Sequence, residues 1–213
     1  MDPNNPYAAP QVALIDEQAP RSLAGWSVGQ LQLLAWLSLA SIAMILVSLL
    51  AVMFAAEQPG SLSERVGDWL SLLATVLGCY LLLRLRAFLE QRFAAKGLLI
   101  PIALIIVFSL LAEGLDWLWG DAIFTELGWK TLGFFATIML MGVMTLWLGI
   151  VLLRIANPYP ALRVMAWMEI VGGGMFASVV LVVVAIIPLL GGTLAMALVF
   201  FRGARELKGN QAA

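Results

Sequence analysis

Long apolar runs dominate this chain, and they restrict it to folds in which helices cross a membrane. No residue from Leu31 to Phe54 is charged, and further apolar runs follow as far as Phe201. About 20 consecutive apolar residues span a bilayer as a helix. The composition agrees, because 62% of the 213 residues are hydrophobic and only 12% are charged, whereas soluble domains are about half apolar and a quarter charged. The predicted fold class is therefore an all-α polytopic membrane helical bundle.

Six transmembrane helices are expected, with five as the alternative. The first four are predicted at about Val28–Phe54, Asp68–Leu85, Gly97–Trp119 and Thr131–Ile155. The remaining apolar run, Val164 to Phe201, is too long for one span, and Pro188 to Gly192 is its only turn material. We therefore place the last two spans at about Leu162–Ile186 and Leu189–Ala204. One bent helix in their place would give five spans and a C-terminus outside the cell.

A basic stretch fixes the expected orientation of these spans. Residues 83–96 contain four basic side chains and one acid, Glu90; the basic ones are Arg84, Arg86, Arg92 and Lys96. Basic connections stay in the cytoplasm, so both termini are predicted to be cytoplasmic. Leu85, Leu89 and Phe93 share one helix face, and a basic amphipathic segment of this kind attracts anionic lipid headgroups. The stretch is thus either a plain topology signal or a docking site for anionic lipids or a partner protein.

The chain is expected to form one membrane domain with two tails. Residues 1–25 hold four prolines and no apolar core, a composition typical of a disordered cytoplasmic tail. The transmembrane helical domain is predicted at residues 26–208. Residues 209–213 form the expected C-terminal tail.

Glu169 is the acid that most needs an explanation. It lies in the inner part of the fifth predicted span and is followed by Gly172, Gly173 and Gly174. An acid inside a membrane is costly and usually faces protein or a wet cavity. The glycines either distort the helix or allow close helix packing. Glu169 is accordingly a candidate intramembrane proton or cation site, or a helix-end acid that reaches water or pairs with Arg154 or Arg163.

Few residues suit metal or catalytic chemistry. Glu113, Asp116 and Asp121 form a weak acidic cluster near the end of the third predicted span, and such oxygens suit a divalent cation, but their spacing matches no metal-binding loop. The chain has no His and one Cys, which excludes His-based metal, haem and triad chemistry. We predict no metal, no cofactor and no enzymatic activity. The net charge of −1 also argues against nucleic acid as a partner.

Three short segments carry a resemblance. The opening Asn5-Pro6-Tyr7-Ala8-Ala9-Pro10, residues 85–93 and residues 200–206 are similar to segments of a loose group of small bacterial inner-membrane proteins with an Asn-Pro-Tyr-x-Ala-Pro N-terminus. The resemblance implies a bacterial inner (cytoplasmic) membrane. It implies no activity and no site residues.

The expected function is that of a non-enzymatic accessory, scaffold or assembly subunit, partnered by the lipid bilayer and by another membrane protein or a second copy. Short connections and abundant small residues on helix faces favour this role. The alternative is a small transporter or channel for protons or cations that uses Glu169.

Overall fold

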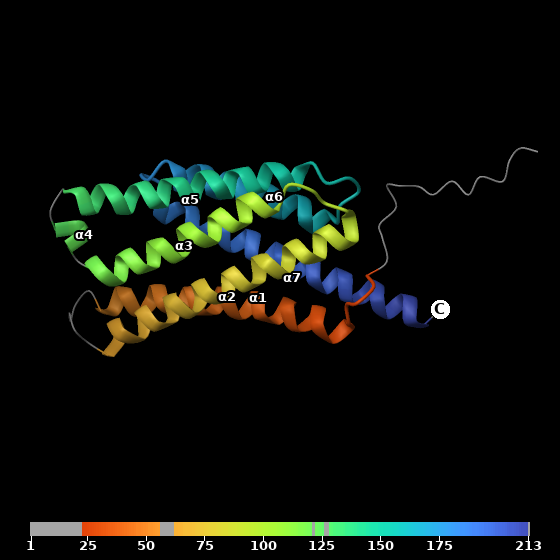
Figure 1. Ribbon diagram of the computed structural model, residues 1–213. Coiled ribbons are helices and arrows are strands. Elements are labelled where there is room, and N and C mark those ends of the chain that lie inside the picture. Colours follow the sequence, from red (N-terminus) through yellow and green to blue (C-terminus); the bar gives the residue numbers. More distant parts are fainter. Residues whose placement is uncertain (1–22, 56–61, 121, 126–127, 213) are drawn as a thin grey trace, which may run out of the picture.

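The computed structural model describes residues 23–55, 62–120, 122–125 and 128–212. All regular elements in these ranges are helices (Figure 1), which confirms the predicted all-α bundle. They are α1 (Val28–Ala55), α2 (Leu62–Phe93), α3 (Leu99–Trp119), the short α4 (Ala122–Thr125), α5 (Trp129–Leu153), α6 (Pro160–Ala177) and α7 (Val182–Ala212).

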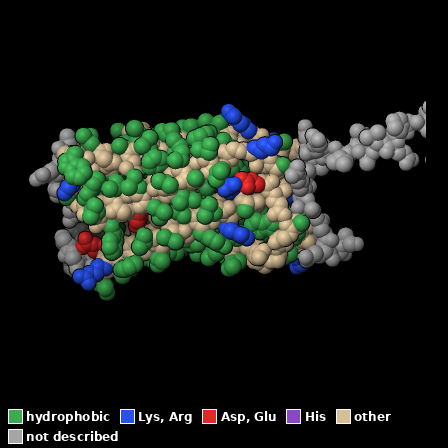
Figure 2. All heavy atoms as spheres, in the orientation of Figure 1, with side chains coloured by type: hydrophobic (Ala, Val, Ile, Leu, Met, Phe, Trp, Pro, Cys, Tyr) green, Lys and Arg blue, Asp and Glu red, His purple; other side chains and the backbone are tan. Residues whose placement is uncertain are grey.

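The long helices have the size and surface of membrane spans. In the described part of the chain, α1, α2, α3, α5 and α7 are long and apolar enough to cross a membrane. With 18 residues, α6 is about 27 Å long at 1.5 Å per residue, and it packs along both α5 and α7. Hydrophobic side chains cover the middle of the molecule in Figure 2, and charged side chains gather toward its ends. The chain is therefore a multi-pass membrane protein.

The six long helices form a closed ring. Each packs against two neighbours, in the order α1, α2, α3, α5, α6, α7 and back to α1, and the α2–α3 contact is the loosest of these. The connections α2–α3 and α5–α6 lie at the same end as the C-terminus (Figure 1), and we call this the basic end. The opposite end, where α1, α3 and α6 end and α2, α5 and α7 begin, is called the acidic end.

The last apolar run is a helical hairpin, but its turn is not where the sequence predicted it. The chain reverses at Ser178–Leu181, between α6 and α7, while Pro188 lies inside α7. At the turn, Val179 adopts a φ of +61°, and the Ser178 hydroxyl accepts a hydrogen bond from the Leu181 amide at 3.3 Å. Pro188 is tolerated because bundle helices in membranes accommodate proline. The glycines that follow it serve helix packing instead of a turn.

One other boundary also differs from expectation. The second span, expected at about Asp68–Leu85, is the central part of α2, which continues through the basic stretch to Phe93, in agreement with the single helix face predicted for Leu85, Leu89 and Phe93. The helix ends where Ala94 and then Gly97 take positive φ values, of 50° and 81°. Residues 1–22 of the expected tail lie outside the described residues, but Leu23 is buried, and so the ordered domain begins before residue 26.

The hydrophobic core fills the ring at its basic end. Its fully buried side chains come from all six long helices and include Leu31, Phe88, Ile102, Leu148, Leu162 and Phe200. Leu85 and Leu89, expected on a lipid-facing surface, are completely buried here. The apolar face of the basic stretch therefore packs into the protein core and not onto the membrane surface.

Candidate functional site

Glu169 lies in the interior of the bundle, midway along α6. Its position is nine residues from the start of α6 at Pro160, which corresponds to about 14 Å along the helix axis. The residue is 9% exposed. Within the part of the chain that the structure describes, its carboxylate has no hydrogen bond and no ion pair, so the expected pairing with Arg154 or Arg163 is not formed.

A glycine of α7 makes room for this carboxylate. A Cβ atom at Gly192 would lie 2.7 Å from Glu169 Oε1 and 3.4 Å from Glu169 Cδ. The separation of 2.7 Å is shorter than carbon and oxygen atoms tolerate without displacement. Gly192 therefore sets the direction in which the Glu169 side chain extends.

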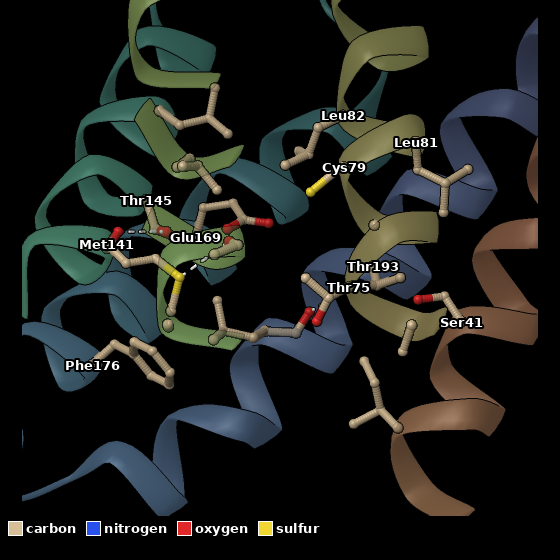
Figure 3. Close-up of a pocket in the computed structure, with 18 of the residues that line it drawn as sticks. Ser41, Thr75, Cys79, Leu81, Leu82, Met141, Thr145, Glu169, Phe176 and Thr193 are labelled. Carbon is tan, nitrogen blue, oxygen red and sulfur yellow. Dashed lines mark hydrogen bonds between the residues drawn. The ribbon is translucent and has the colours of Figure 1, made fainter. Parts of the chain in front are cut away.

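Glu169 faces a cavity of about 310 Å³ that is bounded by all six helices of the ring. Figure 3 shows Glu169 near the middle of this cavity, between Thr145 and Cys79. Five hydroxyl side chains also line it, namely Ser41, Thr75, Ser109, Thr145 and Thr193. Thr145 and Thr193 donate to carbonyl groups one turn earlier in their own helices, at 2.9 and 3.1 Å. Their remaining oxygen lone pairs are free to solvate a bound group.

Glu113 of α3 is the second acid of the same cavity. Its Oε2 atom accepts hydrogen bonds from Thr75 at 3.1 Å and from Ser71 at 3.4 Å, both on α2. These two hydroxyls were not identified from the sequence, although their spacing of four residues places them on one helix face. The sequence had grouped Glu113 with Asp116, but the structure separates their surroundings. Glu113 faces the interior, and Asp116 lines a groove at the acidic end.

The weak acidic cluster is thus not a single site. Asp116 shares the groove at the acidic end with Glu64, Arg65 and Asp68, while Asp121 lies outside the described residues. No group of three or more His, Cys, Asp or Glu side chains able to hold a metal ion occurs among the residues that the structure describes.

Between the cavity and the basic end, aromatic side chains of the core pack together. Phe88 makes edge-to-face contacts with Phe200 at 5.8 Å and with Phe93 at 6.5 Å, and Phe93 contacts Tyr159 at 5.1 Å. Beyond the rings, Arg92 Nη2 and the Tyr159 hydroxyl each donate to Glu206 Oε2 at 2.6 Å. These contacts join α2, the α5–α6 connection and α7.

The surroundings of Tyr159 raise the pKa of its phenol group. Burial, followed by the hydrogen bond to the Glu206 carboxylate, raises the pKa of Tyr159 to about 12. The phenol is therefore protonated at neutral pH and acts as a hydrogen-bond donor.

The four basic side chains of residues 83–96 have different environments. Arg86 forms an ion pair with Glu90 at 2.6 Å, and Arg92 forms the pair with Glu206. Arg84 lies over the Trp26 ring, 4.5 Å from its centre, and Lys96 is exposed. Two of the four residues expected to contact lipid or a partner are thus neutralised within the chain.

The three glycines of α6 do not distort it, since the helix is continuous from Pro160 to Ala177. A Cβ atom at Gly173 would lie 2.5 Å from the Leu146 amide nitrogen of α5, and one at Gly172 would lie 2.8 Å from the Leu189 side chain of α7. Gly174 has only an ordinary contact with Leu146, at 3.8 Å. Two of the three glycines therefore allow close packing of α6 on its neighbours.

Chemically, the cavity is suited to a positive charge. A carboxylate in an apolar interior is costly unless it is paired or neutralised. Glu169 has no protein countercharge in the described residues, whereas Glu113 is held by two hydroxyl donors. A bound cation between these acids would supply the missing charge.

Comparison with known proteins gives no further assignment: no family model, no curated protein and no solved structure matches the chain. The candidate site therefore rests on its geometry.

Proposed function

We propose that this protein is a small membrane transporter that binds a cation in the cavity between Glu113 and Glu169. The observation that supports the proposal is the Glu169 carboxylate, which is buried inside the bundle without a countercharge and faces a cavity. Intramembrane acids of this kind commonly serve ion or substrate pathways. The hydroxyl groups around the cavity supply oxygen atoms that replace part of a cation's hydration.

The closed basic end supports alternating access as the mode of transport. The aromatic contacts of Phe88 and the Arg92–Glu206 pair lie between the cavity and the basic end, whereas on the described α2–α3 side Glu113 lines both the cavity and a groove beside Trp69 and Trp117. A channel would need a continuous path through both ends. The structure would then correspond to a state closed toward the basic end.

We further propose a bacterial inner membrane as the location, with the basic end in the cytoplasm. Basic residues at this end include Arg92, Lys96, Arg154 and Lys208, and cytoplasmic connections carry an excess of such residues.

The accessory role remains a prediction, but the residues that favoured it have another explanation. Gly142 and Gly173 serve the contact between α5 and α6, and Ser38 and Ser41 of α1 are buried inside the bundle. Small residues on these helices therefore serve packing within the chain. Recovery of the protein with one partner at equal stoichiometry would restore support for the accessory role.

A charge-displacement measurement tests transport. Proteoliposomes containing the full chain would be adsorbed on a solid-supported membrane and exposed in turn to KCl, NaCl, choline chloride and tetraphenylphosphonium chloride. At least one cation is expected to produce a transient current that is lost in Glu169→Gln and kept in Glu90→Gln. Glu90 is a suitable control because it is an acid at the bundle surface, paired with Arg86. Currents equal to those of protein-free liposomes for all four cations, or an unchanged current in Glu169→Gln, would refute the proposal.

A further inference from the structure

The loosest contact in the ring, between α2 and α3, contains an apolar groove. Its volume is about 460 Å³, and its apolar walls include Trp69 and Leu72 of α2 and Leu110, Trp117 and Leu118 of α3. Gly114 also lines this groove, and a Cβ atom built there would meet no atom within 4 Å. The seam between these two helices is therefore open where other helix pairs of the ring are closely packed.

This groove faces the lipid. Trp69 is 57% exposed, Trp117 is 68% exposed and Leu118 is 75% exposed, and they lie on helices long and apolar enough to cross a membrane. Trp69 and Trp117 contact each other edge to face at 6.3 Å. They also border the polar groove of Glu64, Asp68 and Asp116 at the acidic end. The two Trp rings thus separate an apolar opening from a polar one.

Glu113 connects the groove to the internal cavity, because it lines both. Its carboxylate is held by Ser71 and Thr75 on the opposite side of the same seam. A molecule entering between α2 and α3 therefore meets apolar walls first and a carboxylate second. Beyond that carboxylate lies the cavity that contains Glu169.

This order of surfaces matches one class of ligand. An apolar groove that ends at an acid complements a molecule with an apolar body and a positive charge. Organic ligands of moderate size occupy pockets of about 300–1,000 Å³, and the cavity of about 310 Å³ falls in this range. Divalent metal ions need several ligands in close geometry, and the described residues hold no group of three or more His, Cys, Asp or Glu side chains that could bind one.

We propose that a lipophilic organic cation enters this protein from the bilayer between α2 and α3, passes Glu113 and binds at Glu169. The inference rests on the proposed transport function and specifies its substrate class and its route of entry.

The probe for this inference is tetraphenylphosphonium, with choline as the hydrophilic comparison. The full chain would be placed in phosphatidylcholine nanodiscs, and saturable binding would be measured by equilibrium dialysis against protein-free nanodiscs. Saturable tetraphenylphosphonium binding is expected, without competition from choline. Glu113→Gln and Glu169→Gln are each expected to weaken it by about tenfold or more, since tenfold corresponds to ~1.4 kcal/mol of interaction. Glu113→Asp, which keeps the charge, should retain more of the affinity than Glu113→Gln.

A pair of glycine variants tests the route. Gly114→Leu places a side chain in the groove, whereas Gly29→Leu makes the same change near the start of α1, where a Cβ atom also meets nothing within 4 Å. The rate at which tetraphenylphosphonium binding approaches equilibrium is expected to fall about tenfold or more in Gly114→Leu and to be unchanged in Gly29→Leu. Thermal unfolding and gel-filtration profiles of the two variants would show that both are folded.

The possible outcomes separate this inference from the transport proposal. Charge displacement by potassium, sodium or choline that depends on Glu169, without tetraphenylphosphonium binding, would overturn the inference and leave transport supported. Tetraphenylphosphonium binding that depends on Glu169 but is equally fast in Gly114→Leu and in the wild type would overturn the route through the seam. Binding that survives both Glu→Gln changes would show simple partition into the protein or lipid, and would overturn the inference as well.

Discussion

At the scale of single residues, the site depends on how one glycine and one acid fit together. Glu169 extends from α6 toward α7, where the backbone of Gly192 leaves space for Oε1. Any side chain at position 192 would occupy that space. The direction of the carboxylate can therefore be changed without removing its charge.

Gly192→Ala tests this fit. The added Cβ atom would lie 2.7 Å from Glu169 Oε1, so the carboxylate must rotate away from its position in the cavity. We expect the cation-dependent current to fall, while unfolding temperature changes little, because the atom displaced is the end of a flexible side chain. Gly191→Ala is the control, since its Cβ atom would meet only the flexible Met168 side chain, with the sulfur at 3.3 Å and Cγ at 3.6 Å. Equal currents in Gly192→Ala and Gly191→Ala would show that the carboxylate position is unimportant.

Tyr159 offers a test of the contacts that close the basic end. Its pKa rises from an ordinary value of 10.0 to about 12, because the phenol is buried and donates to Glu206. Folding thus favours the neutral phenol. Because the pKa is higher in the folded state than in the unfolded state, the neutral phenol stabilises the fold. This stabilisation is fully present at a pH below the pKa of the unfolded state, and it is lost as the pH rises through the pKa of the folded state.

The expected pH window is therefore about 10 to about 12. The stability difference between the wild type and Tyr159→Phe should be constant at neutral pH and shrink as the pH rises through this window. Chemical unfolding of both proteins in detergent at several pH values measures this stability difference. Ultraviolet difference spectra between the wild type and Tyr159→Phe isolate the phenolate absorbance of Tyr159. This absorbance should appear near pH 12. A signal appearing near pH 10 would contradict the donor role of Tyr159.

At the scale of elements, α5 and α6 approach closely through glycines on both helices. Gly149 faces the backbone of Ala166 and Ile170, and Gly173 faces the backbone of Gly142 and Leu146. Small residues permit such contacts in membranes, where van der Waals packing largely drives helix association. This packing fixes α6, and with it Glu169, against α5.

Adjacent glycines of α6 should respond oppositely to the same substitution. Gly173→Ala would place Cβ 2.5 Å from the Leu146 nitrogen and 2.7 Å from the Gly142 oxygen, and overpacking of this kind costs roughly 1–3 kcal/mol. Gly174→Ala meets only Leu146 Cδ1 at 3.8 Å, and better helix propensity should stabilise the helix by up to about 1 kcal/mol. Unfolding of both variants in detergent measures the difference. Similar stabilities would show that α5 and α6 separate easily.

The elements also show which parts of the fold the sequence can predict. The spans α1, α3 and α5 follow from apolar run length, because lipid requires a helix wherever the chain crosses it. The α6–α7 turn was misplaced because Pro188 and Gly191–Gly192 resemble turn residues. Their actual role depends on Met168 and Glu169 of a neighbouring helix, which a local pattern does not reveal.

The candidate site was only partly predictable for the same reason. Glu169 could be identified because an acid within an apolar run is rare. Glu113 was noticed, but its partners Ser71 and Thr75 lie about forty positions away on α2. Only the packing of α2 and α3 shows that Glu113 and Glu169 share a cavity. The face of Leu85 and Leu89 was misassigned because lipid and protein interior are equally apolar, and so hydrophobicity alone does not distinguish them.

At the scale of the whole molecule, charge is unevenly divided between the two ends. Arg65 and Lys130 are the basic residues described at the acidic end, whereas most of the others, including Lys96 and Lys208, lie at the basic end. The hairpin of α6 and α7 returns the chain to that end (Figure 1). The positive-inside rule therefore predicts one orientation for the whole ring.

Single cysteines can test this orientation in cells. In a Cys79→Ala background, Lys96→Cys and Lys208→Cys are expected to react with a membrane-impermeant maleimide only after the membrane is permeabilised. Lys130→Cys should react in intact cells, because its helix begins at the acidic end. The comparison of positions 96 and 208 is decisive for the hairpin, since both reach the same side only if α6 and α7 each cross the membrane. Labelling of position 208 from outside and of position 96 from inside would mean that α6 and α7 together cross once. Glu169 would then no longer lie at the depth on which cation transport depends.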